Sequence, residues 1–188
     1  MLAEALDEAT LTMRARALGE VLRAAGEAAA AGGRVAAEAA AWTVLLDGPM
    51  GAGKTTFTRA LAAGLQVAHP ERVCSPTFTL CMVHPGPVTL VHLDLFRMAD
   101  ADDEGMGGAA GFDALALEEI AAEEDLSGPR VIVVEWAAKW SRPPADRLEI
   151  RLAPALGGAA RRLAATAHGD RSGGLLAAWQ RRLAAPFL

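Results

Sequence analysis

The segment WTVLLDGPMGAGKTT, residues 42–56, joins a short apolar run to a glycine-rich loop that ends in a lysine and two threonines. Its first five residues are apolar or β-branched, and such a run predicts a buried strand. After the loop, residues 54–66 place large apolar side chains four positions apart, which predicts a helix. The segment therefore predicts a strand–loop–helix unit, and the rest of the chain can be arranged around it.

The loop, residues 48–55, matches the pattern G-x-x-x-x-G-K-[ST] in full. The chain has only two lysines, so a chance match from this composition is on the order of one in a thousand. Glycines allow successive backbone N–H groups to point inward and form a nest for an anion. The start of the following helix adds further unpaired N–H groups. The pattern is typical of a phosphate-binding loop; the alternative is an ordinary glycine-rich turn that caps a helix.

The polar residues of the loop have predicted roles in binding ATP with Mg²⁺. We expect Lys54 to reach the β- and γ-phosphates and the Thr55 hydroxyl to ligate Mg²⁺. Thr56 is a candidate donor to the α-phosphate. The predicted nucleotide-binding residues are Gly48, Pro49, Met50, Gly51, Ala52, Gly53, Lys54, Thr55 and Thr56.

An ATPase with such a loop also needs a carboxylate near Thr55 that holds Mg²⁺ or orients water. Asp94 and Glu135 each follow an apolar run, residues 90–93 and 131–134, that predicts a strand. Ligands in open α/β sheets bind outside the carboxyl ends of strands, so both acids are candidates. The alternatives are a solvated acid at a strand end for Glu135 and a turn or helix-capping residue for Asp94.

His92 and Trp136 are neighbours of these acids in the sequence, and the role of each has two possible interpretations. His92 lies two residues before Asp94, so both side chains would project from the same face of a strand. It is either part of the site or a structural hydrogen-bond partner. Trp136 directly follows Glu135 and is either a core residue or a contact of the site.

The remaining sequence predicts a three-layer α/β fold of the P-loop NTPase class, with a mixed, mostly parallel central sheet. Residues 11–40 predict one or two helices broken near Gly32-Gly33, and residues 78–83 and 88–93 predict an antiparallel hairpin. Further strands are predicted at 131–134, 147–152 and 161–167, helices at 115–124 and 175–183, and loops or turns at 99–111 and 157–158. We expect one domain over residues 1–188, with a helical N-terminal extension (1–40), a core (41–170) and a C-terminal helix (171–188).

Composition limits the classes of partner and compartment. The 188 residues carry a net charge of −5 and a pI near 5.4, so no general basic face for nucleic acid is expected. Two cysteines form neither a metal-ligand pattern nor a useful disulfide framework, and both are expected to be small buried residues. With no apolar run long enough to span a membrane and an acidic N-terminus, the sequence predicts a cytoplasmic protein.

Four motifs, in this order, resemble those of the TsaE (YjeE) family, the ATPase component of bacterial tRNA threonylcarbamoyladenosine biosynthesis. They are GPMGAGKTT at residues 48–56, SPTF at 75–78, HLDLFR at 92–97 and VEW at 134–136. The resemblance covers about residues 42–152. The first motif alone is shared by many families, whereas the ordered set of four is much more specific.

The resemblance implies ATP hydrolysis that is weak alone and coupled to the partner complex TsaD–TsaB, which transfers threonylcarbamoyl to N6 of adenosine 37 in tRNA. It implies that tRNA is contacted only through that complex. By motif, Thr55 and Glu135 resemble the Mg²⁺ ligands, and Asp94 resembles an essential acid that acts on Mg²⁺ or on the attacking water. Thr77 resembles a switch-like residue near the γ-phosphate, and Trp136 resembles the tryptophan that follows the second acid.

The sequence departs from the family pattern in two places. Phe96 stands where the family usually has Tyr, which removes a hydroxyl. Thr10 and Thr12 compete as the counterpart of the family's N-terminal Thr, so the adenine contacts stay unassigned.

Two other functions share the phosphate loop. A small-molecule kinase usually adds an Arg-rich lid over the phosphates; Arg142, Arg147 and Arg151 are lid candidates, but the period-two pattern of residues 147–152 places the last two on a strand. A non-catalytic nucleotide switch is the third hypothesis. The presence of Lys54 together with Asp94 and Glu135 argues against a site that has lost catalytic activity.

Overall fold

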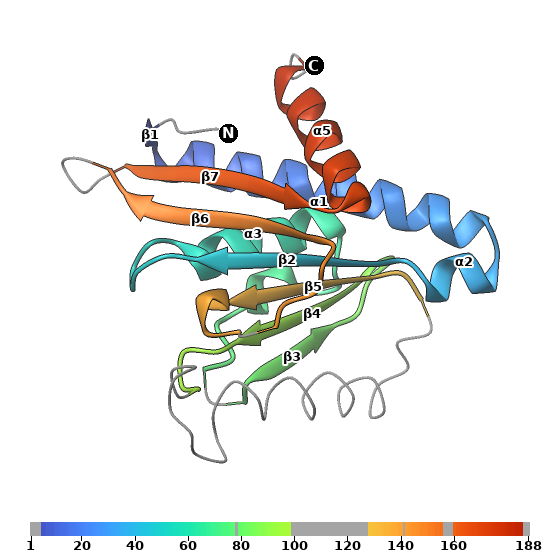
Figure 1. The fold of residues 1–188 in the computed structure, drawn as a ribbon, viewed down its shortest axis with the longest axis horizontal. Coiled ribbons are helices and arrows are strands. Elements are labelled where there is room, and N and C mark those ends of the chain that lie inside the picture. The colour runs from blue at the N-terminus through green and yellow to red at the C-terminus, as the bar shows by residue number, and fades with distance from the viewer. Residues whose placement is uncertain (1–4, 78, 99–127, 141, 156–159, 186–188) are drawn as a thin grey trace.

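A computed structural model describes residues 5–77, 79–98, 128–140, 142–155 and 160–185. Its centre is a seven-stranded sheet with helices packed against it (Figure 1). The strands are β1 (Ala5–Leu6), β2 (Ala41–Asp47), β3 (Cys81–His84), β4 (Thr89–Asp94), β5 (Arg130–Glu135), β6 (Arg147–Pro154) and β7 (Arg161–His168). The helices are α1 (Glu8–Ala31), α2 (Arg34–Glu38), α3 (Lys54–Leu65) and α5 (Asp170–Ala184), with short 3₁₀ helices η1 (Pro70–Arg72) and η2 (Ala137–Lys139).

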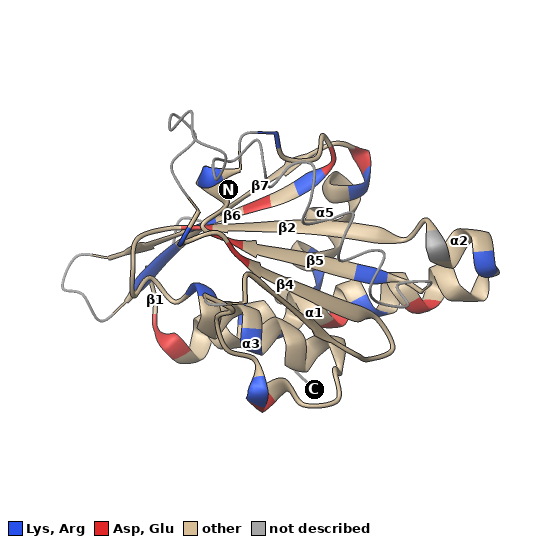
Figure 2. Cartoon of the chain, turned by 90° about the horizontal axis from the view of Figure 1, so that it is seen from below, with Lys and Arg blue, Asp and Glu red and all other residues tan. Residues whose placement is uncertain are grey.

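The strand order is β1-β7-β6-β2-β5-β4-β3. The four central strands β6, β2, β5 and β4 are parallel, while β7 and β3 run antiparallel to their inner neighbours. The register aligns Glu135 with Leu46 on one side and with Asp94 on the other. The carboxyl ends of β2, β5 and β4 therefore meet at one edge of the sheet, and acidic residues mark the ends of β4 and β5 there (Figure 2).

Apolar side chains cover both faces of the central strands. Along β2, Val44 and Leu46 pack into the cluster formed with α1, α3 and α5, while Leu45 joins a second cluster on the opposite face. That second cluster includes Ala137 of η2 and Trp140. Burial on both faces explains why β2 and β5 have nearly continuous apolar sequences. The phosphate-loop α/β fold with a mixed sheet, predicted from sequence, is confirmed.

Two glycines let α1 and α3 approach closely. A Cβ added to Gly64 would lie 2.1 Å from the carbonyl oxygen of Arg16, and one added to Gly19 would lie 2.1 Å from the carbonyl oxygen of Leu61. Both contacts are with backbone atoms, which cannot move aside as a flexible side chain can. The absence of side chains at these two positions therefore sets the distance between the helix that follows the phosphate loop and its main packing partner.

We expect Gly64→Ala to destabilise the fold by about 1–3 kcal/mol, because the two helices must separate to admit the methyl group. Thermal unfolding measures this as a fall in Tm of roughly 2–10 °C for a chain of this length. Gly173→Ala in α5 is the matched control, since a Cβ there has no neighbour within 4 Å. The control should be neutral or raise stability by up to about 1 kcal/mol through helix propensity. Equal Tm values for the two variants would contradict the packing role of Gly64.

Most predicted elements are confirmed with shifted ends. The N-terminal helical region breaks at Gly33, whose φ of 97° precedes α2. Helix α1 begins earlier than expected because the Asp7 carboxylate accepts a hydrogen bond from the Thr10 N–H at 2.7 Å and caps it. The hairpin is confirmed as the pair β3–β4, and the C-terminal helix begins at Asp170 instead of 175.

Other predictions fail or fall outside the described residues. Strand β1 was not predicted; it has two residues and pairs with β7. The expectation that both cysteines are buried is wrong, since Cys74 is exposed and Cys81 half-buried. The loop at 99–111, the helix at 115–124 and the turn at 157–158 lie outside the described residues. Among the described helices, none has the length and apolarity that crossing a bilayer requires.

Candidate functional site

The glycine-rich loop leaves β2 at the sheet edge and enters α3 at Lys54. Gly48, Gly51 and Gly53 have φ angles of 145°, 74° and 100°, a region that side chains with a Cβ rarely adopt. A Cβ on Gly48 would also lie 2.1 Å from the carbonyl oxygen of Leu152. The first N–H groups of α3 have no partner within the helix. The loop thus has the backbone shape of an anion cradle.

Lys54 lies at the mouth of this loop and is almost fully buried. Its Nζ donates hydrogen bonds to the carbonyl oxygens of Gly48 at 2.7 Å and Pro49 at 3.0 Å. The same atom lies 3.7 Å from the centroid of the Trp136 ring. Burial lowers the pKa of the Lys54 ammonium below its usual range, while the carboxylates of Glu135, Asp47 and Asp94 act in the opposite direction. The ammonium is therefore held in a poorly hydrated place where an anion would interact with it strongly.

Glu135 closes the site from the end of β5. Its carboxylate is 2% exposed and accepts a hydrogen bond from Thr55 Oγ1 at 3.0 Å. Thr58 Oγ1 lies 3.3 Å from the other carboxylate oxygen, and His92 Nε2 lies 2.9 Å from that same oxygen. The interpretation of Glu135 as a solvated acid is therefore wrong. His92 takes the role of a structural partner that fixes the carboxylate next to the Thr55 hydroxyl.

Asp94, at the end of β4, is also 2% exposed. Its Oδ2 accepts hydrogen bonds from Ser75 and, at 3.1 Å, from Thr77 Oγ1. Its Oδ1 accepts the N–H of Phe96 at 2.8 Å, which is the bond of an Asx turn. Asp94 therefore combines the predicted turn role with a place in the site, and it ties the loop of residues 75–77 to the sheet edge.

A cavity of about 490 Å³ joins these groups. It is lined by Met50, Gly51, Ala52, Gly53, Lys54, Thr55, Thr56, Ser75, Thr77, Asp94, Phe96, Glu135 and Trp136. The predicted residues Gly48 and Pro49 are not among its described lining residues; instead, their carbonyl oxygens accept hydrogen bonds from Lys54. The volume is within the range of sites that bind ligands of nucleotide size.

Two aromatic rings form one wall of this cavity. The centroids of Phe96 and Trp136 are 5.0 Å apart. Trp136 has a φ of 59°, and a bulky residue in the left-handed region stores roughly 1–3 kcal/mol of strain. This backbone conformation places the indole over Lys54, so Trp136 is a contact of the site and is only partly buried.

Sequence reasoning missed Ser75 and Thr58 as partners of the two acids. Ser75 precedes the predicted Thr77 by two residues and lies 2.7 Å from its hydroxyl, so the spacing alone offered a signal for it. Thr58 follows Lys54 by one helical turn, which places both on the same face of α3. The lid candidates Arg147 and Arg151 lie on β6, as the period-two pattern predicted.

Comparisons with known proteins point to one family. A family model described as threonylcarbamoyl adenosine biosynthesis protein TsaE matches residues 13–162. The tRNA threonylcarbamoyladenosine biosynthesis protein TsaE of Streptomyces coelicolor is 39% identical over 136 residues, which cover 68% of this chain and 81% of that protein. The Bacillus subtilis protein of the same name is 35% identical over 128 residues, 67% of this chain and 70% of the relative.

Two further matches differ in what they cover. The TsaE protein of Treponema pallidum is 38% identical over 96 residues, so the match spans 51% of this chain and 60% of that relative. Among solved structures, the crystal structure of Bacillus subtilis YdiB aligns with a TM-score of 0.59 at 23% identity, covering 96% of this chain and 97% of that one. At this identity, the structural likeness bears on the fold alone.

Proposed function

The chain belongs to the threonylcarbamoyl adenosine biosynthesis protein TsaE family, and from this premise we propose that it binds and hydrolyses ATP with Mg²⁺ in support of a TsaD–TsaB complex. That complex would form N6-threonylcarbamoyladenosine at position 37 of tRNA, and the tRNA would be contacted through the complex. The observation that carries the proposal is the pair formed by the Thr55 hydroxyl and the buried Glu135 carboxylate, 3.0 Å apart beside the phosphate loop.

The residues at this edge fit both ligands. Glycine φ angles and the free N–H groups at the start of α3 suit a triphosphate. Hydroxyl and carboxylate oxygens are the ligands that Mg²⁺ prefers, and it usually takes one or two from the protein. Thr55 and Glu135 would hold the ion, and Asp94 would hold it or a water bound to it. When bound, the ion would neutralise charge on the phosphate oxygens.

Each protein group then has a physical task. Lys54 would leave the carbonyls of Gly48 and Pro49 and pair with the β- and γ-phosphate oxygens, because a charge-assisted bond is stronger than a bond to a neutral carbonyl. Asp94 would orient the attacking water, held in place by Ser75 and Thr77. Thr77 lies on the loop of residues 75–77, so the γ-phosphate could reposition this loop for a partner to sense.

The indole of Trp136 covers the Lys54 ammonium. A triphosphate that reaches this ammonium must displace the ring or slide beneath it. Release of the backbone strain at Trp136 would offset part of the cost of moving the ring. We infer that this contact keeps turnover low in the isolated protein and that the partner complex relieves it.

The test is ATP turnover measured with the chain alone, with a TsaD–TsaB pair from the same organism, and with that pair alone. We expect slow turnover by the chain and a clear stimulation by the pair. Binding of the chain to the pair should be followed in parallel by size-exclusion chromatography. The proposal is wrong if the chain neither binds ATP nor gains turnover when the pair is present.

A further inference from the structure

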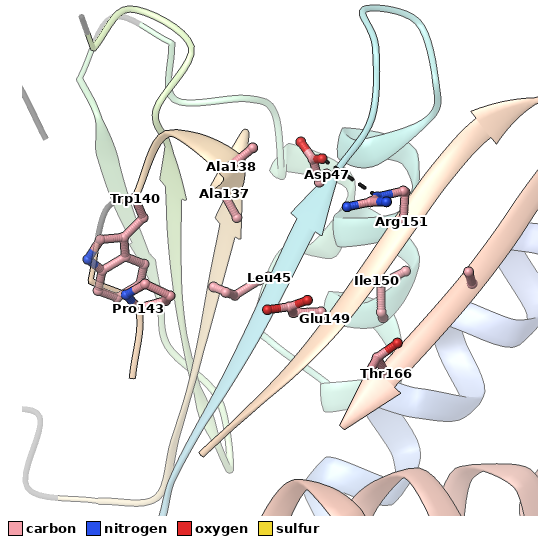
Figure 3. Close-up of a pocket in the computed structure, with 11 residues that line it drawn as sticks. Leu45, Asp47, Ala137, Ala138, Trp140, Pro143, Glu149, Ile150, Arg151 and Thr166 are labelled. Atoms are coloured by element: carbon pink, nitrogen blue, oxygen red, sulfur yellow. Dashed lines mark ion pairs between the residues drawn. The ribbon is translucent and has the colours of Figure 1, made fainter. Parts of the chain in front are cut away.

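A second cavity, of about 450 Å³, lies on the sheet face opposite α1 and α3 (Figure 3). We call it the β2–η2 groove and define it by Leu45, Asp47, Ala137, Trp140, Glu149 and Arg151. Within the described part of the chain, it shares no lining residue with the phosphate-loop cavity. The two are nevertheless adjacent in the chain, because Asp47 directly precedes the loop and Ala137 directly follows Trp136.

Strand register explains the composition of the groove. Leu45 pairs with Glu149 and Asp47 pairs with Arg151 between the parallel strands β2 and β6. Side chains two residues apart share a face, so these four point to the same side of the sheet, as Figure 3 shows. Leu45, Ala137 and Trp140 are buried and apolar. The groove thus joins an apolar floor to a few charged groups, which is typical of a binding site.

The Asp47 carboxylate is half-buried and only loosely paired. Among the described residues its one recorded polar contact is an ion pair with Arg151 at 3.9 Å, and the Arg151 side chain is 76% exposed. Such a pair contributes little and is easily displaced. Glu149, in contrast, already pairs with Arg147 at 2.8 Å and with His168 at 3.3 Å. Asp47 is therefore the carboxylate of the groove that has room for a closer cationic partner.

We propose that the β2–η2 groove receives a lysine or arginine side chain of a partner protein, with the cation at Asp47 and the aliphatic stem against Leu45, Ala137 and Trp140. Long basic side chains combine these two parts, a charged head and an apolar stem. Charge complementarity selects this occupant over an acidic one, because the Asp47 carboxylate is held only loosely by the exposed Arg151 side chain, whereas Glu149 is already paired with Arg147.

Occupancy of the groove also acts on the nucleotide site, a step that rests on the proposed function. Asp47 is near enough to Lys54 for its charge to act on that ammonium, so it must also repel a triphosphate. A partner cation at Asp47 cancels this repulsion.

A second route is mechanical: Lys139 of η2 donates hydrogen bonds to the carbonyls of Phe96 at 3.0 Å and Met98 at 2.7 Å. Movement at η2 would therefore reach both aromatic rings over the phosphate loop.

The first arm of the test is a titration followed by NMR. The probe is Nα-acetyl-arginine N-methylamide, and the comparators are the matching norleucine and aspartate derivatives. We expect the arginine probe to shift the Trp140 indole and Ala137 amide signals of the full chain. Asp47→Asn should weaken this binding about two- to fivefold, as loss of one partly exposed charge pair does. Asp170→Asn, which removes an exposed carboxylate elsewhere, should leave it unchanged.

The second arm measures ATP affinity. Asp47→Asn imitates a neutralised groove, so we expect it to bind MgATP about fourfold more tightly than wild type, from the Coulomb energy between the Asp47 charge and the net charge of −2 on MgATP at roughly 10 Å in water. Asp170→Asn should match wild type. Thermal unfolding of both variants checks that they fold.

The outcomes separate the two proposals. Stronger binding of the aspartate or norleucine probe, or equal binding of the arginine probe by Asp47→Asn, would overturn the assignment of the groove. Probe binding with an unchanged ATP affinity in Asp47→Asn would overturn the coupling. A wild-type chain that binds the arginine probe but no ATP would contradict the proposed function and leave the groove assignment intact.

Discussion

Replacing Lys54 by alanine should lower ATP turnover by at least about a hundredfold, which corresponds to roughly 3 kcal/mol of transition-state stabilisation. The reason is the position of its ammonium at the mouth of the loop, nearly buried and within reach of a bound anion. The variant loses two hydrogen bonds of Lys54 but also the cost of burying its charge, so we expect its Tm to stay close to that of wild type. Turnover and thermal unfolding, measured on the same preparation, check both expectations.

The matched control is Arg72→Ala, which removes a positive charge that is 74% exposed and distant in sequence from the loop. It changes the net charge equally and should keep wild-type turnover. Lys54→Arg tests geometry, because a planar guanidinium does not replace a compact ammonium in a tight cradle. Wild-type turnover in Lys54→Ala would show that the loop does not act on a phosphate.

Glu135→Gln should abolish the dependence of nucleotide binding on Mg²⁺ and reduce hydrolysis by about a hundredfold or more. The amide has the same size but lacks the charge that a divalent cation requires. It also leaves Thr55, Thr58 and His92 with a neutral partner. Isothermal titration with and without EDTA gives the measurement, and the ratio of the two Kd values should approach one in the variant.

Glu71→Gln is the control for this substitution, since its side chain is 66% exposed and lies outside the site. It should preserve the effect of Mg²⁺ on nucleotide affinity. If Glu135→Gln kept the same Mg²⁺ dependence as wild type, the metal would have to be held by other residues, and the pairing of Thr55 with Glu135 would be only structural.

The parts of this molecule that sequence predicted well depend on local chemistry. Glycines with positive φ, an apolar strand before them and a helix after them are encoded within residues 42–66, so the loop was predicted with its residues. Glu135 and Asp94 followed from a rule about strand ends. The register that places both beside Thr55 depends on pairing between strands far apart in the chain, and the structure was needed to establish it.

The parts that sequence missed depend on tertiary contacts. A two-residue strand such as β1 has too little pattern to detect, since it exists only through its pairing with β7. The close approach of α1 and α3 could not be predicted from the sequence. A single glycine in a helical pattern, such as Gly19 or Gly64, indicates only lower helix stability and names no packing partner. Asp47 carries no signal in the sequence beyond its place before the loop; its half-buried, loosely paired carboxylate is recognised only when β6 lies beside β2.

The most direct test of the central claim is a crystal structure with a non-hydrolysable ATP analogue and Mg²⁺. We expect the triphosphate to lie in the loop of residues 48–55 and the Lys54 ammonium to have left the Gly48 carbonyl for a phosphate oxygen. The metal should lie about 2.1 Å from Thr55 Oγ1, with Glu135 beside it. A nucleotide bound elsewhere, or a metal held away from both Thr55 and Glu135, would contradict it.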